Sequence, residues 1–156
     1  MSIAHVRDYL KQFGADSRVM EFEVSSATVE LAAQALNCEP CRIAKTLSFM
    51  VGEQPILIVA AGDCRIDNRK FKETFAAKAK MMTAEELDHF TGLQFGGVCP
   101  FGIPENVTIY LDESLRRFET VYPACGSSNS AIELTLPELE QFSHAKAWVN
   151  VGKDPA

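Results

Sequence analysis

Residues 43–61, IAKTLSFMVGEQPILIVAA, constrain the fold more than any other part of the sequence. In the first half the side chains alternate, so that Ile43, Leu47, Phe49 and Val51 share one face of a strand. The segment ILIVAA in the second half is apolar at every position, which is typical of a strand covered on both faces. The intervening GEQP has the composition of a turn. We therefore expect a hairpin whose second strand is central in a sheet.

Lys45 interrupts the apolar face of the first strand. The alternation points its ammonium group in the same direction as the apolar neighbours, where an unpaired charge is costly. Two explanations are open. The side chain can extend its amino group to water from the start of the strand. Alternatively, the strand lines a cleft, and the lysine faces a ligand.

The remaining predicted elements are helices and short strands on both sides of the hairpin. Helices are expected at 3–13, 25–37, 83–92, 113–118 and 137–143, and one more is expected within the basic segment 65–80. Asp67 is the expected N-cap of the helix in the basic segment, and Thr83 with Glu86 forms a capping box at the start of the helix at 83–92. Strands are expected at 18–24, 78–82, 107–111, 120–124, 131–135 and 146–151. We predict one α+β domain over residues 1–156, with a mixed, mostly antiparallel sheet and surrounding helices.

Length and composition exclude several classes of protein. A chain of 156 residues, 47% of them hydrophobic, can bury roughly two thirds of its unfolded surface in one core. The N-terminal sequence has no apolar signal core, and the apolar run PILIVAAG is too short to cross a bilayer. Five scattered cysteines are an odd number, which fits reduced thiols better than a disulfide framework. We therefore expect a cytoplasmic protein without a membrane partner.

The charge is unevenly distributed. A net charge of −6 argues against coating of nucleic acid through bulk electrostatics. Residues 65–80, however, carry six Lys or Arg against Asp67 and Glu73, a local charge of +4. This basic segment is either a contact for a polyanion or an ordinary solvated helix face, because Phe71 and Phe75 at i and i+4 already explain why the helix packs.

The CEPC motif of Cys38 and Cys41 invites a redox or zinc interpretation. A redox pair sits where a strand leads into a helix N-terminus, which lowers the thiol pKa, whereas this pair leaves a helix and enters a strand. Structural zinc needs two further ligands, and the sequence contains no second such pair. We expect no metal and no cofactor, and a thiol-based sensor is the weakest of the alternatives.

Two other stretches are unusual. The loop GGVCPFG, residues 96–102, permits close approach of its backbone to a ligand, and its N–H groups can form an anion-binding nest, although a plain turn also explains it. Cys99 within it has no neighbouring histidine in the sequence to activate it. The turn GSSN, residues 126–129, interrupts a strand and is either a hairpin or the polar rim of a pocket.

Taken in order, IAKTL, GGVCPFG and GSSNSAIELT resemble the YbaK/ProX family of aminoacyl-tRNA deacylases, relatives of the editing domain of bacterial prolyl-tRNA synthetases. RIDNRKF is also similar to a family segment, and the resemblance covers nearly the whole chain. It implies the fold of that editing domain and hydrolysis of the ester joining a wrong amino acid to the terminal adenosine of a tRNA, most often tRNA for proline. It implies no cofactor, and a prolyl-tRNA synthetase is a candidate partner.

The resemblance also implies residue roles. Lys45 matches the essential lysine of the family and would meet the tRNA end, while amides of Gly97 and Val98 would form an oxyanion hole. Water or a ribose hydroxyl would attack the activated ester without a protein nucleophile. The implied substrate contacts are Gly96, Cys99, Pro100, Phe101, Gly102, Gly126, Ser127 and Ser128, and the implied contacts to the tRNA acceptor end are Arg65, Arg69, Lys70 and Lys72. The main alternative is a non-catalytic module of the same fold that binds an aminoacyl end or a free amino acid.

Overall fold

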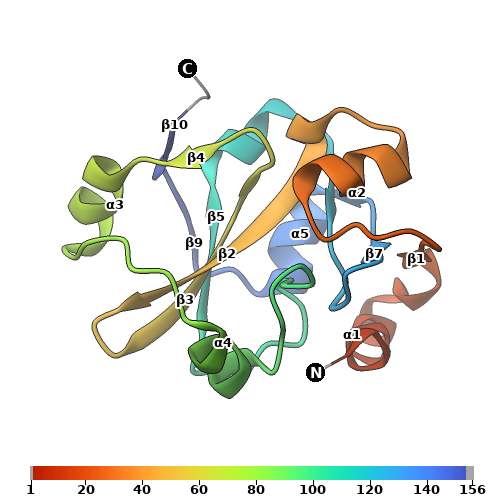
Figure 1. Cartoon of the computed structure of the whole chain (residues 1–156), viewed down its shortest axis with the longest axis horizontal. Coiled ribbons are helices and arrows are strands. Elements are labelled where there is room, and N and C mark those ends of the chain that lie inside the picture. The colour runs from red at the N-terminus through yellow and green to blue at the C-terminus, as the bar shows by residue number, and fades with distance from the viewer. Residues whose placement is uncertain (1, 154–156) are drawn as a thin grey trace.

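A six-stranded mixed sheet forms the centre of the protein (Figure 1). The computed structural model describes residues 2–153. The strand order is β8–β6–β2–β3–β5–β9. The strands are β2 (Ile43–Val51), β3 (Gln54–Ala61), β5 (Thr108–Asp112), β6 (Thr120–Pro123), β8 (Leu134–Thr135) and β9 (Ala147–Val149). Two antiparallel ribbons accompany the sheet, β1 (Met20–Glu21) with β7 (Ser130–Ala131) and β4 (Arg65–Ile66) with β10 (Gly152–Lys153).

The predicted hairpin is confirmed. Strands β2 and β3 pair in antiparallel register from Ala44 opposite Ala61 to Val51 opposite Gln54. The turn is shorter than the predicted four-residue turn GEQP, because only Gly52 and Glu53 lie between the strands. Gly52 has a φ of 61°. Residues 56–61 of β3 are all buried, as expected for a central strand.

The predicted mixed sheet and the α+β class are confirmed. The central sheet contains more parallel pairs, however, than the predicted, mostly antiparallel sheet. There the pairs β2–β6, β3–β5 and β5–β9 are parallel, while β2–β3 and β6–β8 are antiparallel. The reason is the long connection from residue 62 to 107, which contains two helices and returns the chain as a crossover.

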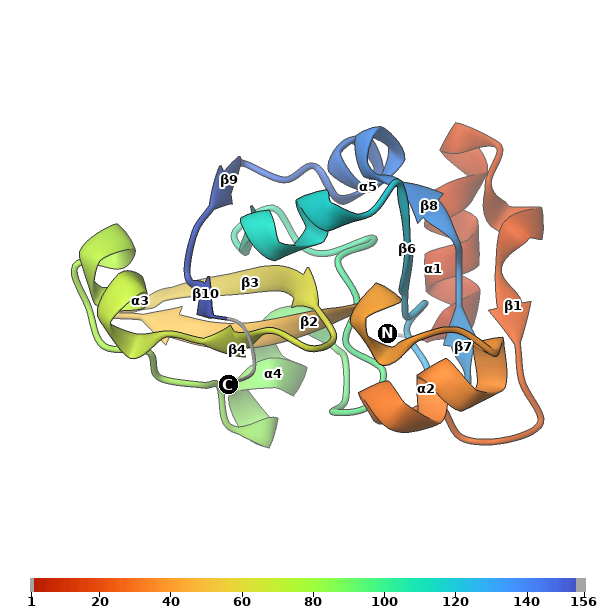
Figure 2. The ribbon, with the colours of Figure 1, turned by 90° about the horizontal axis from the view of Figure 1, so that it is seen from above.

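Five α-helices surround the sheet: α1 (Ile3–Leu10), α2 (Val29–Leu36), α3 (Asn68–Phe75), α4 (Ala84–Thr91) and α5 (Leu136–Ser143), counted within residues 2–153. Short 3₁₀ turns occur at Lys11–Phe13, Asp16–Arg18, Pro40–Arg42 and Glu113–Arg117. The two predicted caps are present, since Asp67 caps α3 and Thr83 forms a capping box with Glu86. The structure adds Thr28 as the cap of α2. Figure 2 shows α2 and α3 near opposite ends of the β2–β3 hairpin.

Several predicted boundaries are wrong. The basic helix ends at Phe75, because Ala76 takes a left-handed conformation, and residues 78–82 form only an isolated bridge between Met81 and Phe49. The short helix expected at 113–118 is present as a 3₁₀ helix over Glu113–Arg117. The strand expected at 18–24 shortens to β1, and the one expected at 131–135 divides into β7 and β8. In residues 2–153 no helix has the length and apolar content needed to cross a bilayer.

Candidate functional site

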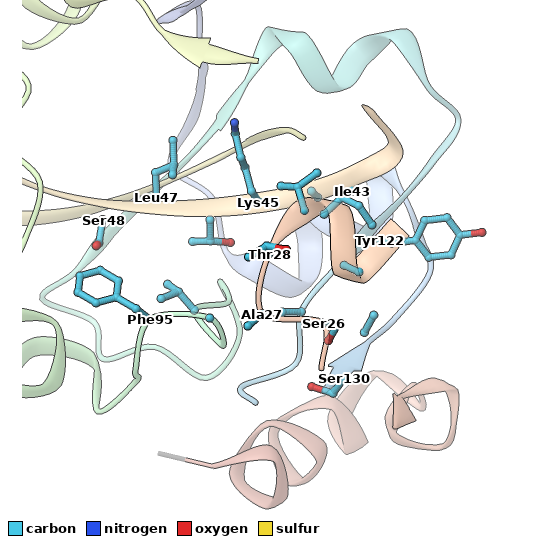
Figure 3. Close-up of a pocket in the computed structure, with 18 of the residues that line it drawn as sticks. Ser26, Ala27, Thr28, Ile43, Lys45, Leu47, Ser48, Phe95, Tyr122 and Ser130 are labelled. Atoms are coloured by element: carbon cyan, nitrogen blue, oxygen red, sulfur yellow. The ribbon is translucent and has the colours of Figure 1, made fainter. Parts of the chain in front are cut away.

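A cavity of about 150 Å³ opens along one edge of β2. Its walls come from the segment that leads into α2, from the loop after α4 and from the end of β6 with β7. Figure 3 shows many of these side chains. The lining residues are Ser26, Ala27, Thr28, Val29, Ala32, Ile43, Ala44, Lys45, Thr46, Leu47, Ser48, Met81, Phe95, Gly96, Val98, Tyr122, Ala124, Ser130 and Ala131.

The pairing pattern of β2 explains why the cavity lies there. On this edge β6 pairs only with Ile43 and Ala44. Further along, the Met50 N–H donates to Lys80 O at 2.9 Å, and Ser48 O accepts from Met82 N–H at 3.0 Å. Between these two contacts the edge is not covered by a strand, and because antiparallel pairs alternate, the backbone groups of residue 46 point toward this opening. The cavity is therefore a gap in the sheet edge.

Two hydroxyl groups in this apolar lining have no hydrogen-bond partner. Ser26 Oγ and Thr46 Oγ1 are buried, and neither finds a partner among residues 2–153. Only 7% of Ser26 is exposed. Its loop is held by the Ser26 N–H, which donates to Ser128 O at 2.6 Å. A buried unsatisfied polar group costs about 1–3 kcal/mol, so both hydroxyls are candidates for hydrogen bonds to a ligand.

Lys45 is the one charged residue in this lining, as far as the structure describes it. Figure 3 shows Lys45 and Leu47 directed to the side of β2 opposite Ser48, which confirms the predicted alternation. The Nζ group donates to Gly62 O at 3.3 Å and also to Cys64 O. Burial lowers the pKa of Lys45 from its ordinary value, although nearby Cys64 opposes this shift.

No carboxylate in residues 2–153 forms an ion pair with the Lys45 ammonium. The lysine is half-buried and held by carbonyl oxygens, so it does not simply extend into water. Its contact with a ligand stays a prediction, and this contact requires the ligand to reach the side of β2 on which Lys45 meets Gly62 and Cys64.

The mouth of the cavity carries two large exposed apolar side chains. Met81 and Phe95 line the cavity and are each 53% exposed. Phe95 immediately precedes the glycine loop. Exposed apolar side chains beside a pocket are typical of a surface that a ligand covers, and an aromatic ring can stack with a nucleobase.

The glycine loop, residues 96–102, and the GSSN turn, residues 126–129, are in close contact. A Cβ atom on Gly97 would lie 2.9 Å from the Ser127 carbonyl carbon, so only glycine permits this approach. The predicted oxyanion role of Gly97 needs correction, however, because its N–H donates to Gln94 O at 3.1 Å and is not available. Gly96 and Val98 do line the cavity.

The rest of the glycine loop lies in the core, and its assignment as a substrate contact is therefore corrected. Cys99 and Phe101 are fully buried, and Pro100 is buried beside them. Burial raises the pKa of Cys99 to about 12, which excludes a reactive thiolate in this conformation. Gly102 instead packs on α1, since its Cβ position lies 2.9 Å from His5 Nε2.

The GSSN turn supports the cavity without lining it. Gly126 packs on α1, where a Cβ would lie 2.8 Å from Val6 Cγ2. The Ser127 hydroxyl is bonded to Ser130 Oγ at 2.7 Å, and Ser128 holds the loop of Ser26 through its carbonyl oxygen. The prediction that Gly126, Ser127 and Ser128 contact the substrate therefore needs correction, because these residues do not line the cavity. Ala124, Ser130 and Ala131 line it instead.

The predicted tRNA contacts divide into separate groups. Arg65 in β4 follows Cys64, whose carbonyl group accepts a hydrogen bond from Lys45, but Arg65 does not line the cavity. Arg69 forms an ion pair with Glu73 at 3.2 Å. Lys70 Nζ donates to Gly152 O at 2.8 Å and thereby ties α3 to β10.

A shallow groove on α3 and the loop after it includes Arg69 and Lys72, together with Asn68, Lys78 and Ala79. Because α3 and α2 lie near opposite ends of the hairpin (Figure 2), this groove is separate from the cavity. The basic segment therefore does not surround the cavity.

Cys38 and Cys41 are free thiols, and burial raises the pKa of both. A raised pKa reduces the thiolate fraction on which redox reactivity depends. No group of three or more His, Cys, Asp or Glu residues in the part of the chain that the structure describes is arranged to hold a metal ion.

The protein is an α+β domain with a cavity between a sheet edge and a glycine loop, and small-molecule sites in proteins are typically concave in this way. The chain belongs to the aminoacyl-tRNA editing domain family, whose model matches residues 23–142. The resemblance identified in the sequence is therefore confirmed.

Relatives of this chain include both free-standing proteins and domains of synthetases. It is 54% identical over 155 residues to "Uncharacterized protein YwhH" of Bacillus subtilis, covering 99% of both chains. It is 30% identical over 110 residues to "Putative Cys-tRNA(Pro)/Cys-tRNA(Cys) deacylase EbsC" of Enterococcus faecalis, covering 69% of this chain and 66% of that one. It is 24% identical to a proline–tRNA ligase of Lactiplantibacillus plantarum, covering 80% of this chain and only 22% of the ligase.

A solved structure supports the same fold. The "Crystal structure of a putative trans-editing enzyme for prolyl tRNA synthetase" superimposes with a TM-score of 0.86 at 28% identity and covers 97% of this chain and 96% of that one.

Proposed function

We propose that this protein is a free-standing hydrolase that removes a wrongly attached amino acid from a tRNA, with tRNA for proline as the first candidate. The observation that carries the proposal is the cavity itself, because it joins the family's glycine loop to the β2 segment that contains Lys45. A volume of about 150 Å³ accommodates a molecule of the size of benzene. The cavity therefore suits an aminoacyl group and leaves the nucleotide outside.

The outer parts of the site suit the terminal nucleotide. Phe95 and Met81 at the mouth offer a surface on which adenine can stack. Lys45 and Arg65 lie close enough to interact electrostatically, and Lys45 forms no ion pair with a carboxylate in the described part of the chain. These two cations are suited to the ribose and phosphate groups of the acceptor end.

The reaction is hydrolysis of an ester. A water oxygen bonds to the ester carbonyl carbon, the bond from that carbon to the ribose oxygen breaks, and the departing ribose oxygen takes up the proton that the water loses. Attack by the neighbouring ribose hydroxyl only moves the ester between the 2′ and 3′ oxygens, so water completes the release in either case. Gly96 and Val98 line the cavity, and their amide groups are the remaining loop candidates to stabilise the oxyanion, since the Gly97 amide is occupied. Positioning of the activated ester supplies much of the rate.

Deacylation of tRNA for proline charged separately with alanine, cysteine and serine tests the proposal. We expect release of at least one of these amino acids at a rate that depends on enzyme concentration. Tight binding of charged tRNA without faster release would instead identify a binding module of the same fold. Activity that appears only after a prolyl-tRNA synthetase is added would identify that synthetase as a required partner.

A further inference from the structure

Ser26 and Thr46 differ from Thr28 and Ser130, which also line the cavity, because the hydroxyl groups of Thr28 and Ser130 have hydrogen-bond partners. Thr28 Oγ1 accepts the Leu31 N–H at 3.2 Å as the cap of α2. Ser130 Oγ is bonded to Ser127 Oγ at 2.7 Å. Only Ser26 Oγ and Thr46 Oγ1 are both buried and without a partner among residues 2–153.

These hydroxyls belong to two walls that are far apart in the sequence. Ser26 lies in the segment before α2, where its backbone N–H is fixed by Ser128 O at 2.6 Å. Thr46 lies in the middle of β2, whose opposite edge is paired with β3 along its length. Ser26 is therefore held by its own backbone hydrogen bond and Thr46 by the pairing of its neighbours in β2 with β3, and neither hydroxyl finds a polar partner in residues 2–153.

We infer that Ser26 and Thr46 determine specificity by hydrogen-bonding a hydroxyl group on the side chain of the amino acid to be removed. This inference rests on the proposed function and names its substrate class, the seryl and threonyl esters. A hydroxyl group can donate one hydrogen bond and accept others, so it can satisfy both protein groups together. An alanyl or valyl group leaves both unsatisfied, and sites of this kind reject analogues that lack the hydrogen-bonding group.

The composition of the cavity favours a hydroxyl group over the α-ammonium group that all aminoacyl esters share. An ammonium group only donates hydrogen bonds and is bound most strongly by a carboxylate. The described lining contains no acidic side chain that could pair with an ammonium group, and its one charged residue, Lys45, is itself a cation. Serine and threonine hydroxyls are also neutral, so their burial here does not require a compensating charge.

The test compares substrates that differ by one hydroxyl group, seryl against alanyl esters and threonyl against valyl esters, on the same tRNA. We expect kcat/KM to favour the hydroxylated member of each pair by about tenfold or more, the worth of one well-formed hydrogen bond. Ser26→Ala and the nearly isosteric Thr46→Val should each reduce this preference by about tenfold. Ser25→Ala is the matched control, because the Ser25 hydroxyl accepts the Ala27 N–H at 3.2 Å outside the lining and should not change the ratio.

The ratio separates specificity from structural damage, because damage lowers kcat/KM on both members of a pair. Equal losses on the hydroxylated and apolar esters would overturn the inference and assign the two hydroxyls to a group common to all substrates. Wild-type preference for the alanyl ester would overturn it as well. Absence of hydrolysis with every ester would refute the proposed function instead.

Calorimetric binding of serylamide and alanylamide analogues of the 3′-terminal adenosine then tests the inference without hydrolysis. The serylamide analogue is expected to bind about tenfold more tightly. Equal affinities would overturn the inference.

Discussion

Replacement of Lys45 by methionine separates the binding of a substrate from the stability of the fold. In the free protein its ammonium group donates to Gly62 O and Cys64 O, and burial lowers its pKa. Loss of these hydrogen bonds destabilises the protein, while removal of a poorly solvated charge stabilises it. Because the two effects oppose each other, we expect the free energy of unfolding to change by about 1 kcal/mol or less, equivalent to roughly 2–4 °C in Tm for a chain of this size.

The effect of Lys45→Met on catalysis should be much larger. A hydrogen bond from an ionised group contributes about 1.5–3 kcal/mol, which corresponds to a loss of about 10- to 150-fold in kcat/KM if Lys45 contacts the substrate. Single-turnover deacylation and thermal unfolding measured on the same preparations provide both values. Lys11→Met is the control, because Lys11 is exposed in the 3₁₀ turn after α1, and neither value should change.

A pH series adds an independent check on Lys45. Its pKa in the folded protein is lower than in the unfolded chain, so only the unfolded chain binds the proton between these two values, and the contribution of Lys45 to stability increases with pH in this interval. Deacylation that depends on the charged lysine should instead decrease as pH rises through the folded pKa. If Lys45→Met lowers activity only in proportion to a loss of folded protein, the ammonium group is structural and our reasoning is wrong.

Gly97→Val should lower the turnover number by about a hundredfold or more, because the new side chain forces the glycine loop away from the neighbouring GSSN turn. Cys99→Ser should retain most activity, because Cys99 is fully buried. An acyl group trapped on Cys99 would contradict the expectation that Gly97→Val is the more damaging of the two variants. Phe95→Ala should raise KM by about tenfold and change kcat little, since stacking of one base contributes about 1–3 kcal/mol; an unchanged KM would place the base elsewhere. The pKa of Glu138 is lowered to about 2 by its hydrogen bond to Arg18, so its stabilising effect is complete above its ordinary pKa and is lost as pH falls toward 2. Arg18→Ala should weaken this acid dependence in urea unfolding experiments, and an identical pH profile would show that the pair is not coupled.

The hairpin was predictable because its pattern is local. Alternation in β2 and the continuous apolar run in β3 depend only on neighbouring residues, and so do the caps at Asp67 and Thr83. The parallel pairing of β2 with β6 was not predictable in the same way. It joins Ile43 to Tyr122, and no local pattern specifies a partner so distant in the sequence.

The candidate site was predicted only in part for the same reason. The sequence identified Lys45 and the glycine loop, but the availability of the Gly97 amide depends on a turn hydrogen bond to Gln94 that composition does not reveal. Thr46 and Ser48, the polar even-numbered positions of β2, are the sequence signal that this face of the strand borders a cavity. The burial of Ser26 has no such local signal, because it follows from the contact of its loop with the turn after β6.

The gap in the edge of β2 gives the site an unusual freedom to change. One boundary of the cavity is a central strand fixed by β3, while much of the remaining wall consists of loop residues 26–28, 95, 96, 98 and 124. Substitutions in these loops alter the shape and polarity of the chamber without removing ladder hydrogen bonds from the central hairpin. Under the proposed function, a change of amino acid preference can therefore arise through single replacements in these loops at small cost in stability.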